Sequence, residues 1–237
     1  MSIMAASQPQ AQELLLSDAY ALVRDGDFEA VEHAFNRHQD AYNRELISAG
    51  NYVIPYDVFL TTDPRVVALT DAWLEAKPDS PQALVAKATF LSHVALIIRG
   101  TDILWDTPAN SVMRMHQLYD RALPLFQRAL DLEPRHLFAA RTLGNFARYA
   151  GDREGRELAD GIDRSLSGPR YSFYRDLHWL QPGWGGSESD MREACDEGAA
   201  ALPSVTAGEC HAVVTLELGT APPKDLLDAA RALEAID

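Results

Sequence analysis

Apolar residues recur along this chain in steps of three and four, and this spacing constrains the fold more than any other feature. The clearest stripes consist of Leu84, Ala88, Leu91, Ala95 and Ile98, and of Leu118, Ala122, Leu125, Ala129 and Leu132. Such steps follow the turn of an α-helix, so each stripe predicts a helix with one apolar face. Comparable stripes are formed by Leu137, Ala140, Leu143, Ala147 and Ala150, by Phe28, Val31, Phe35, Tyr42 and Leu46, and by Leu226, Ala229, Ala230, Leu233 and Ile236.

Residues that begin and end helices stand at the ends of these stripes. Asp63-Pro64 and Ser80-Pro81 each place a capping side chain before a proline at the first helical position, and Asp27 can cap a helix that starts at the next residue. Gly151 follows one stripe as a C-terminal stop, and Ser187 begins an approximate capping box. These signals predict helix boundaries that agree with the stripes.

The fold class expected from these patterns is all-α, built as a short stack of antiparallel helical hairpins. The one β-prone run, residues 213–216, is short and isolated. We expect residues 1–12 to be a mobile N-terminal segment and residues 13–237 to form a single helical-repeat domain. For residues 204–223 the sequence leaves two alternatives open, a helix around 212–218 or an extended arm over the last hairpin.

The charge balance excludes some kinds of partner and favours another. The formal net charge is −14, which repels nucleic-acid phosphates and anionic membranes. Arginines gather between residues 135 and 156, but acidic residues are interleaved with them, so this patch is mixed. We therefore expect a partner protein or peptide of basic character, and neither nucleic acid nor membrane. No motif in the chain encodes its oligomeric state.

The expected compartment is the cytoplasm. The longest apolar run, near residues 94–98, is too short to span a membrane, and the N-terminal residues lack the pattern of a signal peptide. Cys195 and Cys210 form no metal or redox motif. Without an export signal they are expected in a reducing compartment, as free thiols in or near the core.

Part of the chain resembles a tetratricopeptide repeat. The second half of that repeat is matched by Ala122, Phe126, Ala129 and Pro134. Small residues let two helices approach closely, the aromatic ring fills the groove between them, and the proline ends the unit. Residues 143–152 resemble the first helix of a further repeat. Its second half departs from the pattern, because Arg156, Asp160 and Asp163 stand where small or aromatic residues are expected.

A wider resemblance covers about residues 14–203. Its elements are Trp73-x4-Pro78-x-Ser80-x2-Ala83, the pair Arg99-Gly100, and Trp184-Gly185-Gly186-Ser187. Together they resemble a bacterial family of tetratricopeptide-like proteins classed as a domain of unknown function. The resemblance implies a helical-repeat fold and supplies no activity. Gly183 departs from it, since family members usually have an arginine before the tryptophan.

The candidate binding residues are Trp184, Gly185, Gly186, Ser187, Arg99, Trp179, His178 and Tyr174. Two glycines before a capped helix could present backbone N–H groups to an anion or a carboxylate. The alternative is a tight turn that only glycine can make, with the tryptophan packed as a plug. Arg99 interrupts an apolar helix end, where it binds a ligand or serves the structure as an ion pair or a cap. The aromatic stretch of Tyr171, Phe173 and Tyr174 begins a helix whose aromatic side packs on the preceding hairpin, or it contacts a groove.

The function expected from the sequence is a non-enzymatic interaction module: an adaptor, a scaffold or an immunity-type inhibitor of a basic toxin. It would bind its partner through an acidic helical-repeat surface. The chain has no Gly-x-Ser-x-Gly, P-loop or dinucleotide-binding motif, so no catalytic residue, metal ligand or cofactor is expected. The alternative is an enzyme or an enzyme accessory protein with a metal or small-molecule site between helices. Its candidate side chains are Glu29, Glu32, His33, His116 and Asp120.

Overall fold

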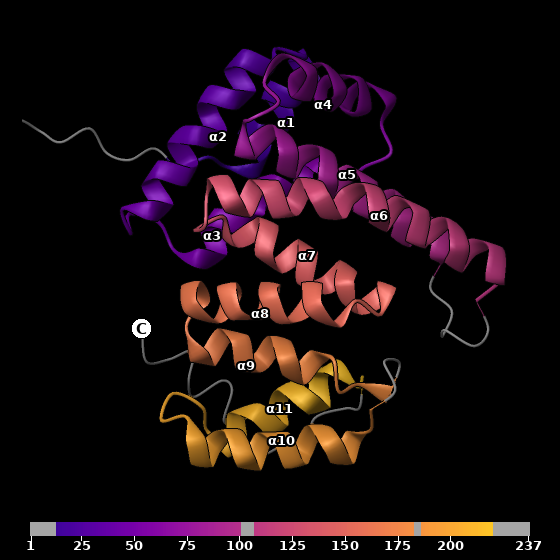
Figure 1. The fold of residues 1–237 in the computed structure, drawn as a ribbon. Coiled ribbons are helices and arrows are strands. Elements are labelled where there is room, and N and C mark those ends of the chain that lie inside the picture. The colour runs from indigo at the N-terminus through magenta and orange to yellow at the C-terminus, as the bar shows by residue number, and fades with distance from the viewer. Residues whose placement is uncertain (1–12, 101–106, 183–185, 220–237) are drawn as a thin grey trace, which may run out of the picture. The chain divides into compact units, whose positions relative to one another are not determined.

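The computed structural model describes residues 13–100, 107–182 and 186–219, and these residues form helices and turns without any strand (Figure 1). This confirms the all-α class for the described residues. The elements are α1 (Leu16–Asp25), α2 (Phe28–Asn43), α3 (Ala49–Val53), the 3-10 helix η1 (Ile54–Phe59), α4 (Pro64–Ala76), α5 (Pro81–Arg99), α6 (Ala109–Leu132), α7 (Leu137–Ala150), α8 (Arg153–Ser167), α9 (Pro169–His178), α10 (Glu188–Ala201) and α11 (Ala207–Glu217). The predicted mobile segment 1–12 and the stripe from Leu226 lie outside the described residues.

The chain divides into two compact units, with the boundary between Leu166 and Ser167. The first unit contains α1 to α7 and nearly all of α8, and the second contains α9 to α11. Such a division does not test whether the two units fold together. The single domain expected over residues 13–237 therefore stays a prediction.

The helices begin and end where the capping residues predict. Asp27 accepts hydrogen bonds from two backbone N–H groups at the start of α2, and Asp63 accepts one from Arg65 at 2.9 Å. Ser80 accepts one from the backbone of Ala83 at 3.1 Å. Gly151 ends α7 with φ of 71°, a left-handed conformation that favours glycine. The local signals in the sequence are confirmed at these positions.

The pair α5 and α6 forms the centre of the first unit, where the two helices lie side by side (Figure 1). The alanines on the predicted stripes are completely buried, which lets the two backbones approach closely. They are Ala88 and Ala95 on α5 and Ala122 and Ala129 on α6. Phe126 is also fully buried, whereas Leu132 at the end of its stripe is 46% exposed. The stripes therefore mark the buried helix faces, and their ends extend into solvent.

The Trp73-x4-Pro78-x-Ser80 pattern has a structural explanation in the first unit. Glu32 on α2 accepts a hydrogen bond from Trp73 Nε1 at 2.5 Å and another from Ser80 Oγ at 2.7 Å. The Ser80 hydroxyl also accepts the hydrogen bond that caps the start of α5, so it contacts both the Glu32 carboxylate and the α5 backbone. Trp73 itself is fully buried. The pattern thus holds α2, α4 and the start of α5 together.

α5 is long and apolar enough to cross a membrane, judged by length and composition alone. The sequence prediction missed this because it considered only uninterrupted runs of apolar residues, and polar residues such as Thr89 and Ser92 interrupt the apolar run within the helix. In the most apolar window of α5, 61% of the residues are buried inside the protein. A core helix meets the same length and composition, so this finding is weak evidence for a membrane span.

The departure from the tetratricopeptide pattern corresponds to ion pairs between α7 and α8. Arg141 Nε lies 3.3 Å from Asp163 Oδ1, and Arg148 Nη2 lies 2.8 Å from Asp160 Oδ2. All four side chains are largely buried. A buried carboxylate needs a charged or hydrogen-bonded partner. The two aspartates therefore belong to a polar helix contact, which replaces the expected small and aromatic residues.

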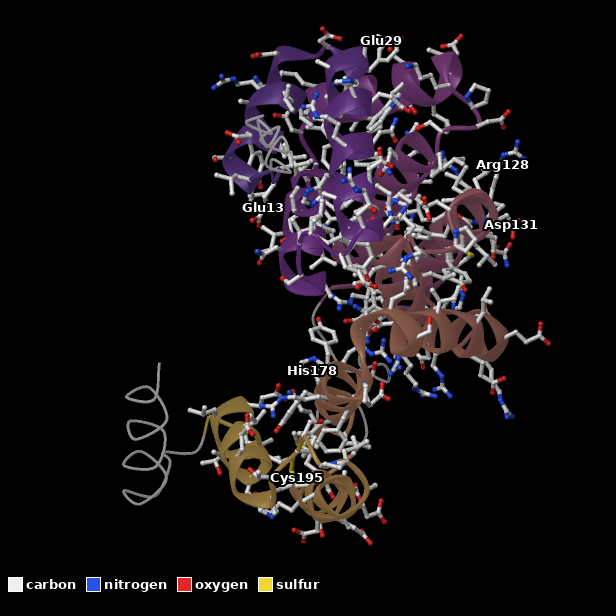
Figure 2. All side chains as sticks on the ribbon, turned by 90° about the vertical axis from the view of Figure 1, so that its left-hand side faces the viewer. Glu13, Glu29, Arg128, Asp131, His178 and Cys195 are labelled. Atoms are coloured by element: carbon white, nitrogen blue, oxygen red, sulfur yellow. A yellow bond between two sulfur atoms is a disulfide. The ribbon has the colours of Figure 1, made fainter. Side chains whose placement is uncertain are left out.

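The second unit has a small core, and a disulfide joins Cys195 on α10 to Cys210 on α11 (Figure 2). Their Cα atoms are 5.5 Å apart, and both residues are fully buried. The prediction of free thiols was wrong. It rested on the expected compartment, whereas the pairing depends on two helices bringing the cysteines face to face.

Of the alternatives for residues 204–223, the helix is confirmed as α11 within the described part.

Candidate functional site

The predicted glycine-rich segment is only partly described. Trp184 and Gly185 lie outside the described residues. At Gly186, an added Cβ would lie 2.1 Å from the carbonyl oxygen of Leu180, and the Gly186 N–H donates to the Gln181 carbonyl at 3.2 Å. The backbone approach at Gly186 therefore requires glycine, and its N–H group is already engaged. This favours the tight-turn alternative at that position.

Ser187 begins α10 as the capping pattern predicts. Its hydroxyl accepts a hydrogen bond from the backbone of Asp190 at 3.1 Å and donates one to Asp190 Oδ2 at 2.7 Å. The Ser187 hydroxyl thus uses both its donor and an acceptor position within the first turn of α10.

The predicted residues of α9 take part in contacts within the second unit. Tyr174 is half-buried, with the Arg170 guanidinium 5.5 Å from its ring centroid and the Phe173 ring at 5.3 Å. His178 is exposed and lies 3.5 Å from Glu217 on α11, while Trp179 meets the His178 ring edge-on. The contact between His178 and Glu217 joins α9 to α11, and Tyr174 packs against the core of the unit.

Arg99 lies in the first unit, separate from the other candidates. It is 8% exposed, its Nη1 donates to the Gly100 carbonyl at 3.1 Å, and its guanidinium lies 5.3 Å from the ring centroid of Tyr149. A cation that bonds the last carbonyls of a helix stabilises its C-terminus. These contacts favour the structural alternative for Arg99.

A buried polar network crosses the first unit, and the sequence did not predict it. Tyr52 donates to Gln39 and lies 3.0 Å from His136 Nδ1 and 3.2 Å from the Tyr56 hydroxyl. Tyr56 donates to Gln82 Oε1 at 2.7 Å. These side chains come from α2, α3, η1, α5 and the residue that precedes α7. The network therefore joins helices that are distant in sequence.

Burial keeps the ionisable members of this network neutral. It lowers the pKa of His136 to about 3, and it raises the pKa of both Tyr52 and Tyr56 well above the usual range. His136 Nδ1 accepts a hydrogen bond from the backbone of Ala139, so the proton of the neutral ring is on Nε2 and is donated to Gln82. The two tyrosine O–H groups and the ring N–H of His136 each have an acceptor in the network, which is typical of a structural role.

The side chains named for a metal or small-molecule site do not converge. Glu29 accepts from Lys77 at 2.5 Å, Glu32 accepts from Trp73 and Ser80, and His33 accepts from Arg37. Among the residues that the structure describes, no group of three His, Cys, Asp or Glu side chains could hold a metal ion.

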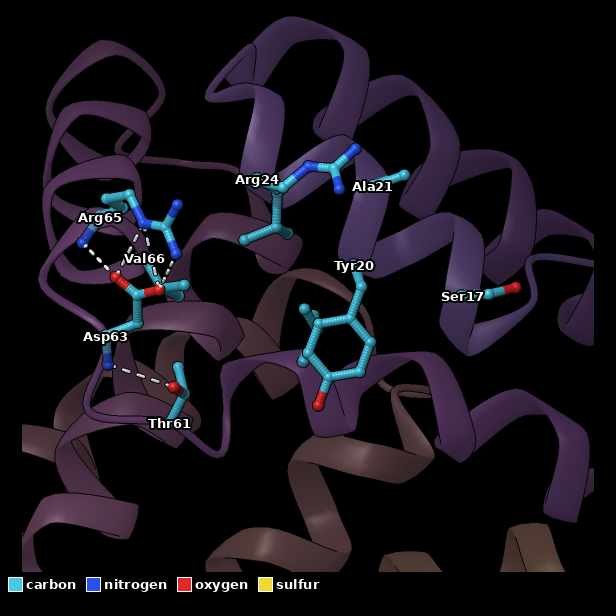
Figure 3. Close-up of a pocket in the computed structure, with 10 residues that line it drawn as sticks. Ser17, Tyr20, Ala21, Arg24, Thr61, Asp63, Arg65 and Val66 are labelled. Carbon is cyan, nitrogen blue, oxygen red and sulfur yellow. Dashed lines mark hydrogen bonds and ion pairs between the residues drawn. The ribbon is translucent and has the colours of Figure 1, made fainter.

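A hollow of about 260 Å³ lies between α1, η1 and α4 in the first unit (Figure 3). Arg65 binds Asp63 through Nε and Nη2, and these hydrogen bonds hold the pKa of Asp63 down at about 2. Arg24 lies 3.8 Å from Asp25. Because each cation faces a carboxylate, the hollow has little net charge with which to select a charged ligand.

A shallow groove of about 450 Å³ lies between α9 and α10 in the second unit. Its lining is mostly apolar, with two acidic side chains. The lining residues are Phe173, Asp176, Leu177, Leu180, Ala194, Glu197, Gly198, Ala201 and Leu202. The predicted candidate Tyr174 is adjacent in sequence to Phe173, but it does not belong to this lining set.

α10 exposes a row of carboxylates beside this groove. Its acidic residues are all exposed, and Arg192 is its only base. The acidic residues are Glu188, Asp190, Glu193, Asp196 and Glu197. Glu188 pairs with Arg192 and Asp196 with His211, but Glu193 and Glu197 have no hydrogen bond or ion pair with any described residue. Four residues apart on one helix, these two carboxylates repel each other.

Sequence reasoning missed this acidic groove, although one signal was available. The acids of residues 188–197 cluster against one arginine, whereas the prediction of a basic partner used the net charge of the whole chain. The apolar lining residues could not be identified in the same way, because their side chains meet across two helices.

Comparison with known proteins gives one match. A family model described as a domain of unknown function (DUF4034) matches residues 16–153, which lie in the first unit. The Trp-Gly-Gly-Ser element and the α9–α10 groove lie outside the matched residues. Searches of curated proteins and of solved structures found no match.

Proposed function

This chain belongs to the DUF4034 family, and because that family's description carries no activity, we propose a function from the surfaces of the molecule itself. The chain is a non-enzymatic interaction module that binds a basic partner protein or peptide. The binding surface is the acidic face of α10. Adaptor, scaffold and immunity-type inhibitor are forms of this one activity, and the identity of the partner decides between them.

The observation that carries the proposal is the unneutralised pair Glu193 and Glu197. On α8, by contrast, Glu157 pairs with Arg153 at 2.7 Å, and Asp160 pairs with Arg148 on α7. An unpaired row of like charges costs helix stability and attracts a basic surface. A partner that supplies lysine or arginine would remove the repulsion and gain complementary contacts.

For the first unit we propose a tetratricopeptide-like stack of hairpins as the scaffold. Support comes from the fully buried Ala122, Phe126 and Ala129, and from the turn at Pro134 between α6 and α7. The cytoplasmic location and the absence of nucleic-acid and membrane partners stay predictions.

The proposal is tested by affinity capture from lysate of the native source, with the full chain as bait. We expect a partner in fixed ratio that is retained at low salt and lost at high salt, because ions screen exposed charges. Glu193→Gln/Glu197→Gln should lose this partner. The matched control Glu75→Gln/Glu154→Gln neutralises exposed acids of the first unit and should keep it. Equal capture by both variants would contradict the proposal.

A further inference from the structure

We propose that the α9–α10 groove receives one segment of the basic partner, with apolar side chains in the groove and lysine or arginine beside Glu193 and Glu197. This inference rests on the proposed function and names the chemistry of the partner. The segment is a short peptide stretch in which apolar residues are flanked by basic ones.

The groove offers an apolar surface to such a segment. Phe173, Leu177 and Leu180 line it from α9 and the turn that follows, and Ala194 and Ala201 line it from α10. Apolar surface in water is unfavourable, so covering it with apolar side chains contributes to binding. The small alanine side chains leave room that a larger residue of the partner can fill.

Gly198 determines the shape of the groove. A Cβ at this position would lie 2.3 Å from Cε2 of Phe173, so the phenylalanine ring lies directly on the backbone of α10. Any other residue would displace this ring. The ring of Phe173 therefore packs on the backbone at Gly198 and forms one wall of the groove.

The unpaired carboxylates stand on the same side of α10 as the groove. Glu197 lines the groove itself, and Glu193 precedes it by one helical turn. From α9, Asp176 also lines the groove. A segment seated in the groove therefore places its flanking residues next to carboxylates.

Charge complementarity decides among possible occupants. An acidic segment would add to the repulsion between Glu193 and Glu197. A second copy that docked through the same surface would bring its own acidic α10 face against this one. A basic segment neutralises the row, which makes it the occupant that the charges favour.

The test uses the full chain and a fluorescent peptide with leucines flanked by lysine and arginine, read by anisotropy. A second peptide replaces the leucines with serine and keeps the charge. We expect wild-type protein to bind the leucine peptide about tenfold more tightly or better. Ala194→Trp should fill the groove and remove that preference. The matched control Ala72→Trp, at an exposed position of α4, should keep it.

Each result separates this inference from the proposed function. If the wild-type protein binds both peptides with equal affinity and Glu193→Gln/Glu197→Gln binds neither, the apolar groove does not take part in binding. The acidic surface of the proposed function would still be supported by that result. No binding of either peptide would overturn both. Ala201→Trp repeats the test at an exposed position, so that a folding defect in Ala194→Trp does not decide the outcome.

Discussion

The two units of this chain stabilise their interiors by different means. The first buries large aromatic side chains such as Trp73 and Phe126, together with a hydrogen-bonded polar network. The second has a small core around Leu177, Met191 and Val214, and a disulfide joins its last two described helices. A small unit buries a smaller fraction of its surface, so a covalent cross-link replaces part of the missing core. In this chain the longer unit therefore relies on its core, and the shorter one adds a covalent bond.

The units also differ in charge. Their formal charges are equal, although the second has fewer than half as many residues. In the first unit, arginine side chains neutralise the buried aspartates. In the second, the exposed Glu193 and Glu197 have no hydrogen bond or ion pair with any described residue. The first unit, which matches the family model, pairs its buried charges, and the second presents the unpaired carboxylates of α10.

The largest expected effect concerns the core of the first unit. Trp73→Ala should lower its free energy of unfolding by about 3–5 kcal/mol, because the indole is fully buried and Glu32 loses a hydrogen bond. Urea unfolding measures the loss. Trp73→Phe keeps most of the buried volume and should cost less. If both variants unfold like the wild type, the first unit does not depend on this packing.

Removal of the disulfide should affect the second unit alone. The cysteines are 15 residues apart in sequence, and closing a loop of that length contributes about 3 kcal/mol in the chain-entropy model. Cys195→Ala/Cys210→Ala should lose about this much, seen as faster hydrogen exchange in α10 and α11. Reducing agent should reproduce the effect in the wild type and change nothing in the variant. Faster exchange throughout α5 and α6 would show that the units are not independent.

The polar network predicts a pH dependence for the first unit. The pKa of His136 is about 3 in the folded protein and 6.5 in a free side chain, so the unfolded chain takes up a proton first as the pH falls. Stability from neutral His136 is complete above pH 6.5 and decreases as the pH falls toward 3. The decrease is at most about 1.4 kcal/mol per pH unit.

His136→Asn keeps an acceptor at the helix start and removes the titration. Urea unfolding of both proteins between pH 4 and 7 should give a smaller slope for the variant. His38, whose pKa burial also lowers, acts equally in both. Identical slopes would show that His136 has the same pKa in the folded and the unfolded chain, which would contradict this account of the network.

The smallest expected effect is a gain in stability, whereas the changes above lower it. Glu193→Gln should raise the stability of the second unit by about 0.2–0.5 kcal/mol, because it removes the repulsion with Glu197. Glu157→Gln on α8, which loses an ion pair, should lower stability by a comparable amount. Thermal unfolding at low salt compares the two. A stabilised variant that no longer binds the partner would show that Glu193 serves binding at the expense of stability.

Local features of this fold were predictable from the sequence, and long-range ones were not. The stripes and the caps Asp27, Asp63 and Ser80 act within a few residues, so their pattern is visible in the chain. The hydrogen bond from Trp73 to Glu32 and the Cys195–Cys210 bond depend on which helices become neighbours. The groove required both kinds of information, because its charges lie along one helix and its apolar walls lie on two.

Binding of a basic segment in the α9–α10 groove is tested most directly by chemical-shift mapping of the isotope-labelled full chain during titration with the leucine peptide. We expect the largest shifts at the backbone amides of Phe173, Leu177, Glu193, Glu197 and Gly198, with smaller shifts when salt is added. Shifts centred on α1 and α4 around Arg24 and Arg65, or no shifts at all, would contradict the account.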